Sequence, residues 1–233
     1  MWEGVVPGLQ HAFQVLRPDL RGFGDTPLPG GPYADVDDLV ALLDHLGMND
    51  AAVVGSSLGG RVALELATTY PDRVRELVLL CPGLRGVEPT AAAEAFDGEE
   101  ERLLECGDVE GAVRLNVDTW LGPAADDAAR DALAVVQRRA FEVQLAADAV
   151  EPPPAPRRVD VDPAAVSVPT LVVAGAHDMD HFQNVAAHLA EHIPGAEHMV
   201  LDWAGHLPAL ERSDVVQALL LDALRGDAGV HAS

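Results

Sequence analysis

The sequence predicts an α/β protein with a mostly parallel sheet flanked by helices. Short apolar runs alternate with longer stretches that repeat apolar residues at helical spacing, and this alternation is typical of βα units. One acidic, alanine-rich stretch in the middle of the chain lacks such apolar runs, which indicates an insertion of helices. A chain of 233 residues has room for one domain of this kind with an inserted subdomain.

The first part of the predicted core covers residues 1–81. Its helix over 34–48 rests on apolar residues at positions 36, 39, 42, 43 and 46, which share one helical face. In chain order we expect a strand at 12–19 (AFQVLRPD), that helix, a buried strand at 51–55 (AAVVG), a helix at 58–69 and a strand at 75–81 (RELVLLC).

The composition changes between residues 82 and 166. This segment has helical patterns but no strand pattern, and it ends in the proline-rich run EPPPAPRRVDVDP, so we expect short helices closed by a stiff linker. The alternation of strands and helices then returns. The second part of the core, residues 167–225, is expected to hold a strand at 170–175 (TLVVAG), a helix at 181–193, a strand at 197–202 (EHMVLD) and a helix at 210–225, before a flexible tail at 226–233.

The net charge of the chain and its lack of lysine exclude several classes of function. A formal net charge of −23 argues against nucleic-acid binding, because an acidic protein offers phosphates no basic patch. The chain has no lysine, which excludes a P-loop nucleotide site, a Schiff-base aldolase and a pyridoxal-phosphate enzyme.

Cysteines and targeting signals are also informative. Cys81 and Cys106 share no short motif, so neither a disulfide framework nor a zinc site is expected. The first residues, MWEGVVPG, lack the layout of a signal peptide, and no apolar stretch is long enough to span a bilayer. We therefore expect a cytoplasmic protein without a membrane partner.

A serine in a glycine-rich turn is the first candidate for chemistry. Residues 55–59 match G-x-S-x-G only when Ser57 is the central residue. The sharp strand-to-helix turn of this motif requires small residues two before and two after the nucleophile, and Ser56 would have Val54 and Leu58 at those places. The motif therefore selects Ser57, although on its own it also fits a glycine-rich turn with solvated serines.

A nucleophilic serine needs a histidine base and a carboxylate that orients the histidine. Asp178 follows the strand at 170–175, and His206 follows the last strand, so both are expected at the carboxyl edge of the sheet. The order serine, acid, histidine is that of strand-to-helix nucleophile turns. Asp180, two residues further into the loop, is the alternative acid.

Other polar residues favour structural roles. His177, His181, His188 and His192 form a histidine-rich patch, but no carboxylate or cysteine completes a ligand set in sequence. The pattern favours a solvated helix face, and we expect no metal. Arg21 and Asp25 are interpreted as structural.

Five segments of the sequence resemble the α/β-hydrolase family, and the resemblance covers nearly the whole chain. It is similar to the branch that holds small carboxylesterases, enol-lactonases and carbon–carbon bond hydrolases. The segments are RPDLRGFGDT (17–26), VVGSSLGGRVALELA (53–67), PDRVRELVLL (71–80), TLVVAGAHD (170–178) and AGHLPALE (204–211).

The resemblance implies a role for each candidate. Ser57 would be the nucleophile, Asp178 the acid and His206 the base, and the backbone N–H of Leu58 would serve the oxyanion hole. Residues 82–166 would form the cap and its linker. Trp120 and Phe141 would lie on cap helices, where they would either line the acyl pocket or bury the small core of the cap itself.

The resemblance also implies that some family elements are absent. The family begins with a hairpin and a central strand that ends in His-Gly, whose next residue gives the second oxyanion donor. This sequence contains no His-Gly, so the N-terminal strands and that donor are expected to be missing. Either Met1 is an internal residue of a longer protein, or the chain is a natural truncation.

We therefore expect a cofactor-independent serine hydrolase that cleaves a small ester, thioester or lactone through an acyl-enzyme on Ser57. The alternative is a non-catalytic or impaired ligand-binding protein of the same fold, because the second oxyanion donor is missing. The sequence does not define the substrate within this class or the oligomeric state.

Overall fold

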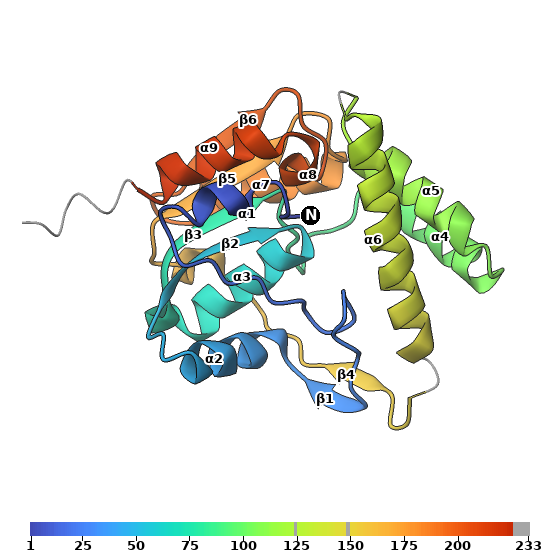
Figure 1. The fold of residues 1–233 in the computed structure, drawn as a ribbon, viewed down its shortest axis with the longest axis horizontal. Coiled ribbons are helices and arrows are strands. Elements are labelled where there is room, and N and C mark those ends of the chain that lie inside the picture. The colour runs from blue at the N-terminus through green and yellow to red at the C-terminus, as the bar shows by residue number, and fades with distance from the viewer. Residues whose placement is uncertain (124, 148–149, 226–233) are drawn as a thin grey trace, which may run out of the picture.

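A four-stranded parallel sheet lies at the centre of the molecule (Figure 1). The computed structural model describes residues 1–123, 125–147 and 150–225. The strand order is β2-β3-β5-β6, and a separate parallel pair joins β1 to β4. The strands are β1 (Gly31–Tyr33), β2 (Ala51–Ser56), β3 (Val74–Leu80), β4 (Pro154–Pro156), β5 (Thr170–Gly175) and β6 (Glu197–Leu201).

Helices connect the strands and cover the sheet. Several begin with a side chain that accepts a hydrogen bond from the first turn, such as Thr90 before α4 and Asp126 before α6. The helices are α1 (Val6–Leu9), α2 (Asp35–His45), α3 (Leu58–Thr69), α4 (Ala91–Glu105), α5 (Val109–Trp120), α6 (Asp127–Ala146), α7 (Asp180–His192), α8 (Pro208–Glu211) and α9 (Ser213–Ala223).

The two faces of the sheet pack against different helices. Alternate side chains of a strand point to opposite faces, so Leu77 and Leu79 of β3 pack with α2, α3 and α7, whereas Val78 and Leu80 pack with α1 and α9. These four side chains are fully buried, as expected for a central parallel strand. This three-layer core holds the carboxyl ends of β2, β5 and β6 at one edge, where the candidate site lies.

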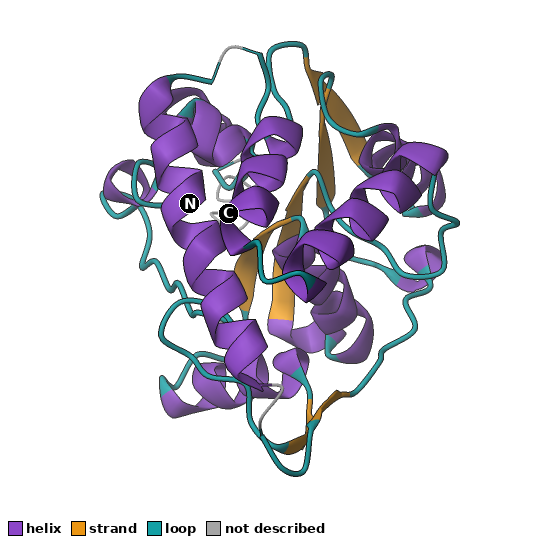
Figure 2. Cartoon of the chain, turned by 90° about the vertical axis from the view of Figure 1, so that its right-hand side faces the viewer, coloured by secondary structure: helices purple, strands orange, loops and turns teal. Residues whose placement is uncertain are grey.

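Helices α4, α5 and α6 stand together beside the sheet, as Figures 1 and 2 show. We call residues 91–146 the helical segment. Ala112, Val113 and Phe141 form its own buried cluster. The segment also touches the core, since α4 contacts α7 and α6 contacts α8.

The prediction of a strand at residues 12–19 is wrong. This stretch has no regular secondary structure, because among the described residues no strand lies beside it to accept its backbone hydrogen bonds. Its apolar side chains still pack, since Phe13 and Val15 contact the cluster under α1 and α9. β2 consequently lies at an edge of the four-stranded sheet.

Two further expectations need correction. The sequence predicts no strand in the proline-rich linker, but Pro154–Pro156 form β4 and pair with β1. The last helix is divided, because the backbone of Arg212 leaves the helical region (φ −141°) between α8 and α9. The strands predicted at 51–55, 75–81, 170–175 and 197–202 and the helices predicted at 34–48, 58–69 and 181–193 lie within a few residues of those positions. The sequence predicts neither α1 nor β1, and the predicted tail at 226–233 lies outside the described residues.

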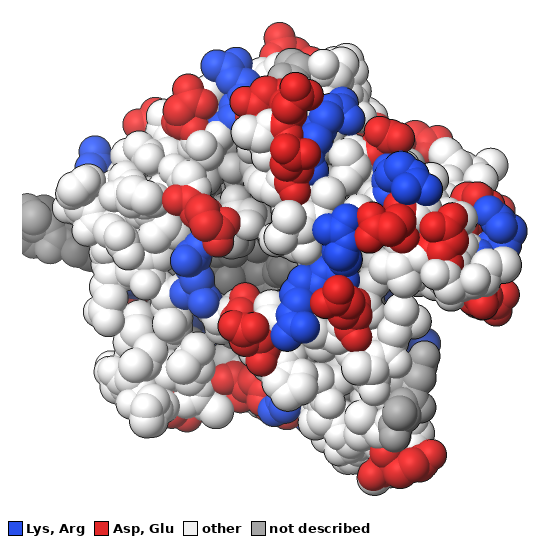
Figure 3. Space-filling view, turned by 45° about the vertical axis from the view of Figure 1, so that its right-hand side comes forward, with Lys and Arg blue, Asp and Glu red and all other residues white. Residues whose placement is uncertain are grey.

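Acidic and arginine side chains lie interspersed over the face shown in Figure 3. Several form exposed ion pairs, such as Arg138 with Glu110 and Arg102 with Glu99. Of the helices in the described part of the chain, none combines the length and apolarity that a membrane span requires.

Candidate active site

Ser57 lies in the turn between β2 and α3 with a strained backbone. Its φ of 52° and ψ of −117° are rare for a residue with a side chain. Three backbone hydrogen bonds hold this conformation: the Ser57 N–H donates to Leu80 O at 3.0 Å, and the Ser57 carbonyl accepts from Arg61 and Gly83 at 3.1 Å. The turn thus presents the Ser57 side chain at the carboxyl edge of the sheet.

The glycines around Ser57 do not carry equal steric demands. A Cβ at Gly55 would lie 2.6 Å from the carbonyl carbon of Gly59 and 2.7 Å from the Cα of Gly60, both backbone atoms. A Cβ at Gly60 would lie 2.9 Å from the Cβ of Pro82. A Cβ at Gly59 would meet nothing within 4 Å, so the predicted need for a small residue two positions after Ser57 is not found here.

The structure brings Ser57, His206 and Asp178 into one hydrogen-bonded line. Nε2 of His206 lies 2.7 Å from Oγ of Ser57, and Nδ1 of His206 lies 2.8 Å from Oδ2 of Asp178. An ionised carboxylate only accepts hydrogen bonds, so it requires a proton on Nδ1 and leaves Nε2 free to accept from the Ser57 hydroxyl. His206 and Asp178 are buried, whereas Ser57 is partly exposed.

The loop after β5 fixes the carboxylate. Oδ1 of Asp178 accepts the N–H of Met179 at 2.7 Å, and the Asp178 carbonyl accepts Nε2 of Gln183 at 2.6 Å. Asp180, the alternative acid, is the first residue of α7 and accepts the hydroxyl of Thr90 at 2.6 Å. Asp178, and not Asp180, therefore accepts the hydrogen bond from His206.

The loop that carries His206 is tied to the helical segment by Glu211. Its carboxylate accepts the backbone N–H of Gly205 at 2.9 Å and that of Gly122 at 3.0 Å. The N–H of His206 itself donates to the carbonyl of Trp120 at 2.9 Å. Burial raises the pKa of Glu211, against the lowering effect of these backbone donors. Sequence reasoning missed Glu211, although it ends the quoted segment AGHLPALE.

Aromatic side chains surround the imidazole of His206. Its ring centroid lies 4.1 Å from that of Phe182 and 4.7 Å from that of Trp120, and Trp120 in turn lies 4.5 Å from Phe96. Trp120 thus lies against His206, and it also packs on the cluster of Leu121, Leu133 and Leu207. Phe182 and Phe96 were missed, because only the packing of separate helices brings Phe182 to His206 and Phe96 to Trp120.

A cavity of about 450 Å³ opens between the helical segment and the loop of Asp178. Most of its lining is apolar, and Phe96 joins it to the aromatic side chains around His206. Its lining residues are Ala92, Ala95, Phe96, Leu115, Thr119, His177, Asp178 and Met179. Phe141 lies elsewhere, in the buried cluster of the helical segment.

The remaining candidates lie apart from Ser57. The rings of His188 and His192 stack at 4.1 Å on α7, whereas His181 lies against Phe182, so the histidine-rich patch does not converge on one point. Arg21 forms a two-pronged ion pair with Asp38, with Nη2 to Oδ1 at 2.7 Å. The Asp25 backbone N–H bonds weakly to Asp19, at 3.4 Å.

Cys81 completes one group of potential metal ligands with Asp178 and His206, whose ligand atoms lie within 4.8 Å of one another. Two of these three groups already bond to each other, and Sγ of Cys81 donates to the carbonyl of Gly205 at 3.6 Å. Burial and the neighbouring Asp178 raise the pKa of the Cys81 thiol, so it stays protonated. These contacts fit a packed thiol better than a metal ligand.

The two residues that flank Ser57 in the turn have different environments. Leu58 is the first residue of α3, so its N–H has no acceptor within the helix and lies at the positive end of the helix dipole. Ser56, the other serine of the turn, is buried, and its hydroxyl has no hydrogen-bond partner among the described residues.

Comparison with known proteins places this geometry in a family. The model of the alpha/beta hydrolase family matches residues 1–219. The chain belongs to the alpha/beta hydrolase family. As in other members of the fold, helices flank a parallel sheet, and the hydrolase relatives identify the chain as an enzyme of this family.

The relatives include several kinds of hydrolase. The chain is 30% identical to a pimeloyl-[acyl-carrier protein] methyl ester esterase of Neisseria meningitidis, with 97% of this chain and 89% of the relative covered. It is 31% identical to a 2-hydroxymuconate semialdehyde hydrolase of Pseudomonas putida, covering 94% and 79%. A crystal structure of a hydrolase from Pseudomonas aeruginosa matches with a TM-score of 0.75 and 29% identity, covering 96% of this chain and 84% of that chain.

Proposed function

We propose that this alpha/beta hydrolase is a cofactor-independent serine hydrolase that cleaves a small ester, thioester or lactone through an acyl-enzyme on Ser57. The observation that carries the proposal is the hydrogen-bonded line Ser57–His206–Asp178, with separations of 2.7 and 2.8 Å. These distances are those of a nucleophile, a base within proton-transfer reach and a carboxylate that orients the base.

The first half of the reaction forms the acyl-enzyme. Oγ of Ser57 attacks the substrate carbonyl carbon while its proton moves to Nε2 of His206. Asp178 holds Nδ1–H and stabilises the imidazolium that forms. The tetrahedral intermediate collapses as His206 gives its proton to the leaving alcohol, thiol or ring oxygen, and the acyl group stays on Ser57.

The second half returns the free enzyme. A water molecule gives a proton to Nε2 of His206 and attacks the acyl carbonyl. His206 then returns the proton to Oγ of Ser57, and the carboxylic acid is released. The backbone N–H of Leu58 and the start of α3 would stabilise the oxyanion in both halves.

The helical segment would act as the cap of the active site. The 450 Å³ cavity beneath α4 and α5 falls in the range of small-ligand pockets, which is about 300–1,000 Å³. Its apolar lining suits a substrate with a hydrocarbon part. Trp120 and Phe182 would exclude water from the His206 side of the reacting carbonyl.

Hydrolysis of short p-nitrophenyl esters tests the proposal. The native protein should release p-nitrophenol, and Ser57→Ala should abolish this release, whereas Ser56→Ala should retain it. Equal rates for the native protein and Ser57→Ala would contradict the proposal.

A non-catalytic ligand-binding protein is the second candidate. It is favoured by the absence of any His-Gly from the sequence, since that motif supplies the expected second oxyanion donor. Tight binding of a small molecule that survives Ser57→Ala, without turnover of any ester, would support this candidate.

A further inference from the structure

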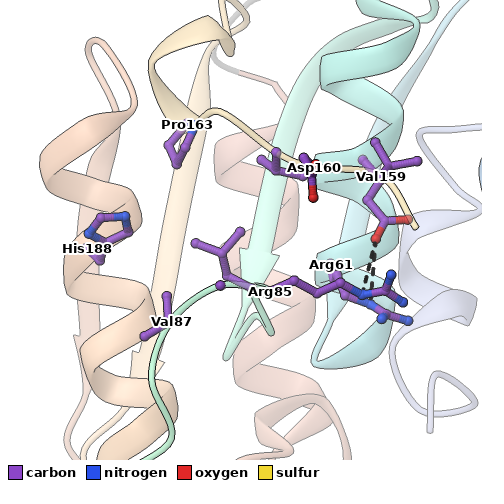
Figure 4. A pocket seen from close by; sticks show the side chains of 11 residues that line it. Arg61, Arg85, Val87, Val159, Asp160, Pro163 and His188 are labelled. Carbon is purple, nitrogen blue, oxygen red and sulfur yellow. Dashed lines mark ion pairs between the residues drawn. The ribbon is translucent and has the colours of Figure 1, made fainter.

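A second cavity, of about 360 Å³, lies on the face of the sheet covered by α3 and α7 (Figure 4). Arg61 and Glu65 reach it from α3, Arg85 and Val87 from the loop after β3, and His188 from α7. Arg61 is four residues and Glu65 eight residues after Ser57, so the cavity begins about one helical turn, roughly 6 Å, along α3 from the nucleophile. It shares no lining residue with the cavity beneath the helical segment.

Three charged side chains in this cavity each have one buried polar atom without a hydrogen-bond partner among the described residues. Among the described residues, Nε of Arg61, Nη1 of Arg85 and Oε1 of Glu65 are all buried without a partner. Glu65 stands 3.9 Å from Nε of Arg61 and 4.0 Å from Nε of Arg85, which is ion-pair distance but too long for a hydrogen bond. The Glu65 side chain is only 6% exposed, so water has little access to it.

Two arginines and one buried carboxylate line the cavity. Asp160, the other acid in the lining, is exposed. Outside the lining, the Asp35 carboxylate also stabilises the positive charges of Arg61 and Arg85. Burial and the like charge of Arg85 lower the pKa of Arg61, against the opposing effects of Glu65 and Asp35. Burial also raises the pKa of Glu65.

We propose that this cavity binds a small oxyanion, a carboxylate or phosphate group, between Arg61 and Arg85. The planar guanidinium presents paired N–H donors that match the oxygens of either group, and hydrogen bonds to such anions are short and strong. Glu65 would hold the two arginines in place without touching the anion. In a chain with a net charge of −23, a partly buried pair of arginines around open space is an exception to the acidic surroundings.

Thermal unfolding in the presence of anions tests this site. Inorganic phosphate and succinate are titrated separately against sodium chloride at matched ionic strength, with Ser57→Ala so that no turnover interferes. Saturable stabilisation by phosphate identifies a phosphate site, and saturable stabilisation by succinate identifies a carboxylate site. No saturable shift with either anion overturns the proposal.

Matched variants assign the binding to the two arginines. Arg85 lies on a loop, and 32% of its side chain is exposed. We expect Arg85→Gln and Arg61→Gln each to weaken anion binding at least tenfold. Arg75→Gln removes an exposed arginine that pairs with Asp50 and should leave binding unchanged. An Arg85→Gln protein that binds as tightly as the control overturns the proposal.

Glu65→Gln tests whether the cavity binds a negatively or a positively charged ligand. It removes the negative charge beside the arginines while keeping the shape of the side chain, so anion binding should stay as tight or become tighter. A ligand held by the Glu65 carboxylate itself, such as a cation, would lose its binding in this variant, and that result would overturn the proposal.

Discussion

The asymmetry between Gly55 and Gly59 gives a sharp test of how the Ser57 turn is built. Both glycines belong to the G-x-S-x-G motif, two residues before and two residues after Ser57. Gly55→Ala would place a Cβ against the backbone of Gly59 and Gly60, whereas Gly59→Ala would place one in open space. Gly59 does not have a positive φ, so alanine fits its backbone conformation.

The size of the effect follows from these contacts. A Cβ at Gly55 would be 2.6–2.7 Å from two backbone carbons. The distance between this Cβ and each carbon must increase by about 1 Å to reach ordinary van der Waals separation. Overpacking of this kind destabilises by about 1–3 kcal/mol, and we expect the upper end because backbone cannot rotate away. A displacement of about 1 Å at Ser57 should also lower kcat/KM roughly a hundredfold.

Gly59→Ala should behave in the opposite way. Alanine reduces the freedom of the unfolded chain and favours the first turn of α3, so this variant should gain about 0.4–1 kcal/mol of stability. Urea unfolding gives both free energies, and ester hydrolysis gives the loss for Gly55→Ala. Equal destabilisation by the two variants, or a neutral Gly55→Ala, would refute the steric reasoning.

Three further predictions concern acidic residues. Asp178→Asn should lower kcat/KM about ten-thousandfold by reversing the tautomer of His206, whereas Asp180→Asn should change it less than about threefold; the opposite order in steady-state kinetics would reassign the acid. Glu211→Gln should lose about 1–3 kcal/mol in urea unfolding, because one of the two carboxylate oxygens that accept the Gly205 and Gly122 N–H groups becomes an NH2 donor; unchanged stability would show that this bridge contributes little. Because the pKa of Glu65 is raised in the folded protein, the unfolded chain loses this proton at a lower pH than the folded protein does. As the pH rises above the ordinary pKa of 4.5, the free energy of unfolding of the native protein should therefore fall relative to that of Glu65→Gln. A constant difference between the two free energies from about pH 4 to about pH 8 would contradict this.

The candidate site could be predicted from sequence because each of its members follows a strand within a few residues. Ser57, Asp178 and His206 come after β2, β5 and β6, and parallel strands bring their carboxyl ends to one edge of the sheet. The order of these residues along the chain then restricts their roles. Nothing beyond local pattern and the rules of parallel sheets is needed for this step.

Other features depend on packing that local sequence does not carry. The apolar pattern at 12–19 suits a strand, but whether a strand forms depends on a neighbouring strand, and none lies there among the described residues. Phe182 meets His206, and Glu211 joins Gly205 to Gly122, only because separate segments dock against one another. The cavity of Arg61 and Arg85 likewise forms between α3, α7 and two loops.

Reaction with a fluorophosphonate probe followed by peptide mass spectrometry tests whether Ser57 is an activated nucleophile. An activated serine attacks this phosphorus centre, so we expect a single adduct on Ser57 that disappears in Ser57→Ala and persists in Ser56→Ala. His206→Ala should slow labelling strongly, since Nε2 accepts the Ser57 proton. A folded native protein that acquires no adduct, or acquires one on Ser56, would contradict the role of Ser57 as nucleophile.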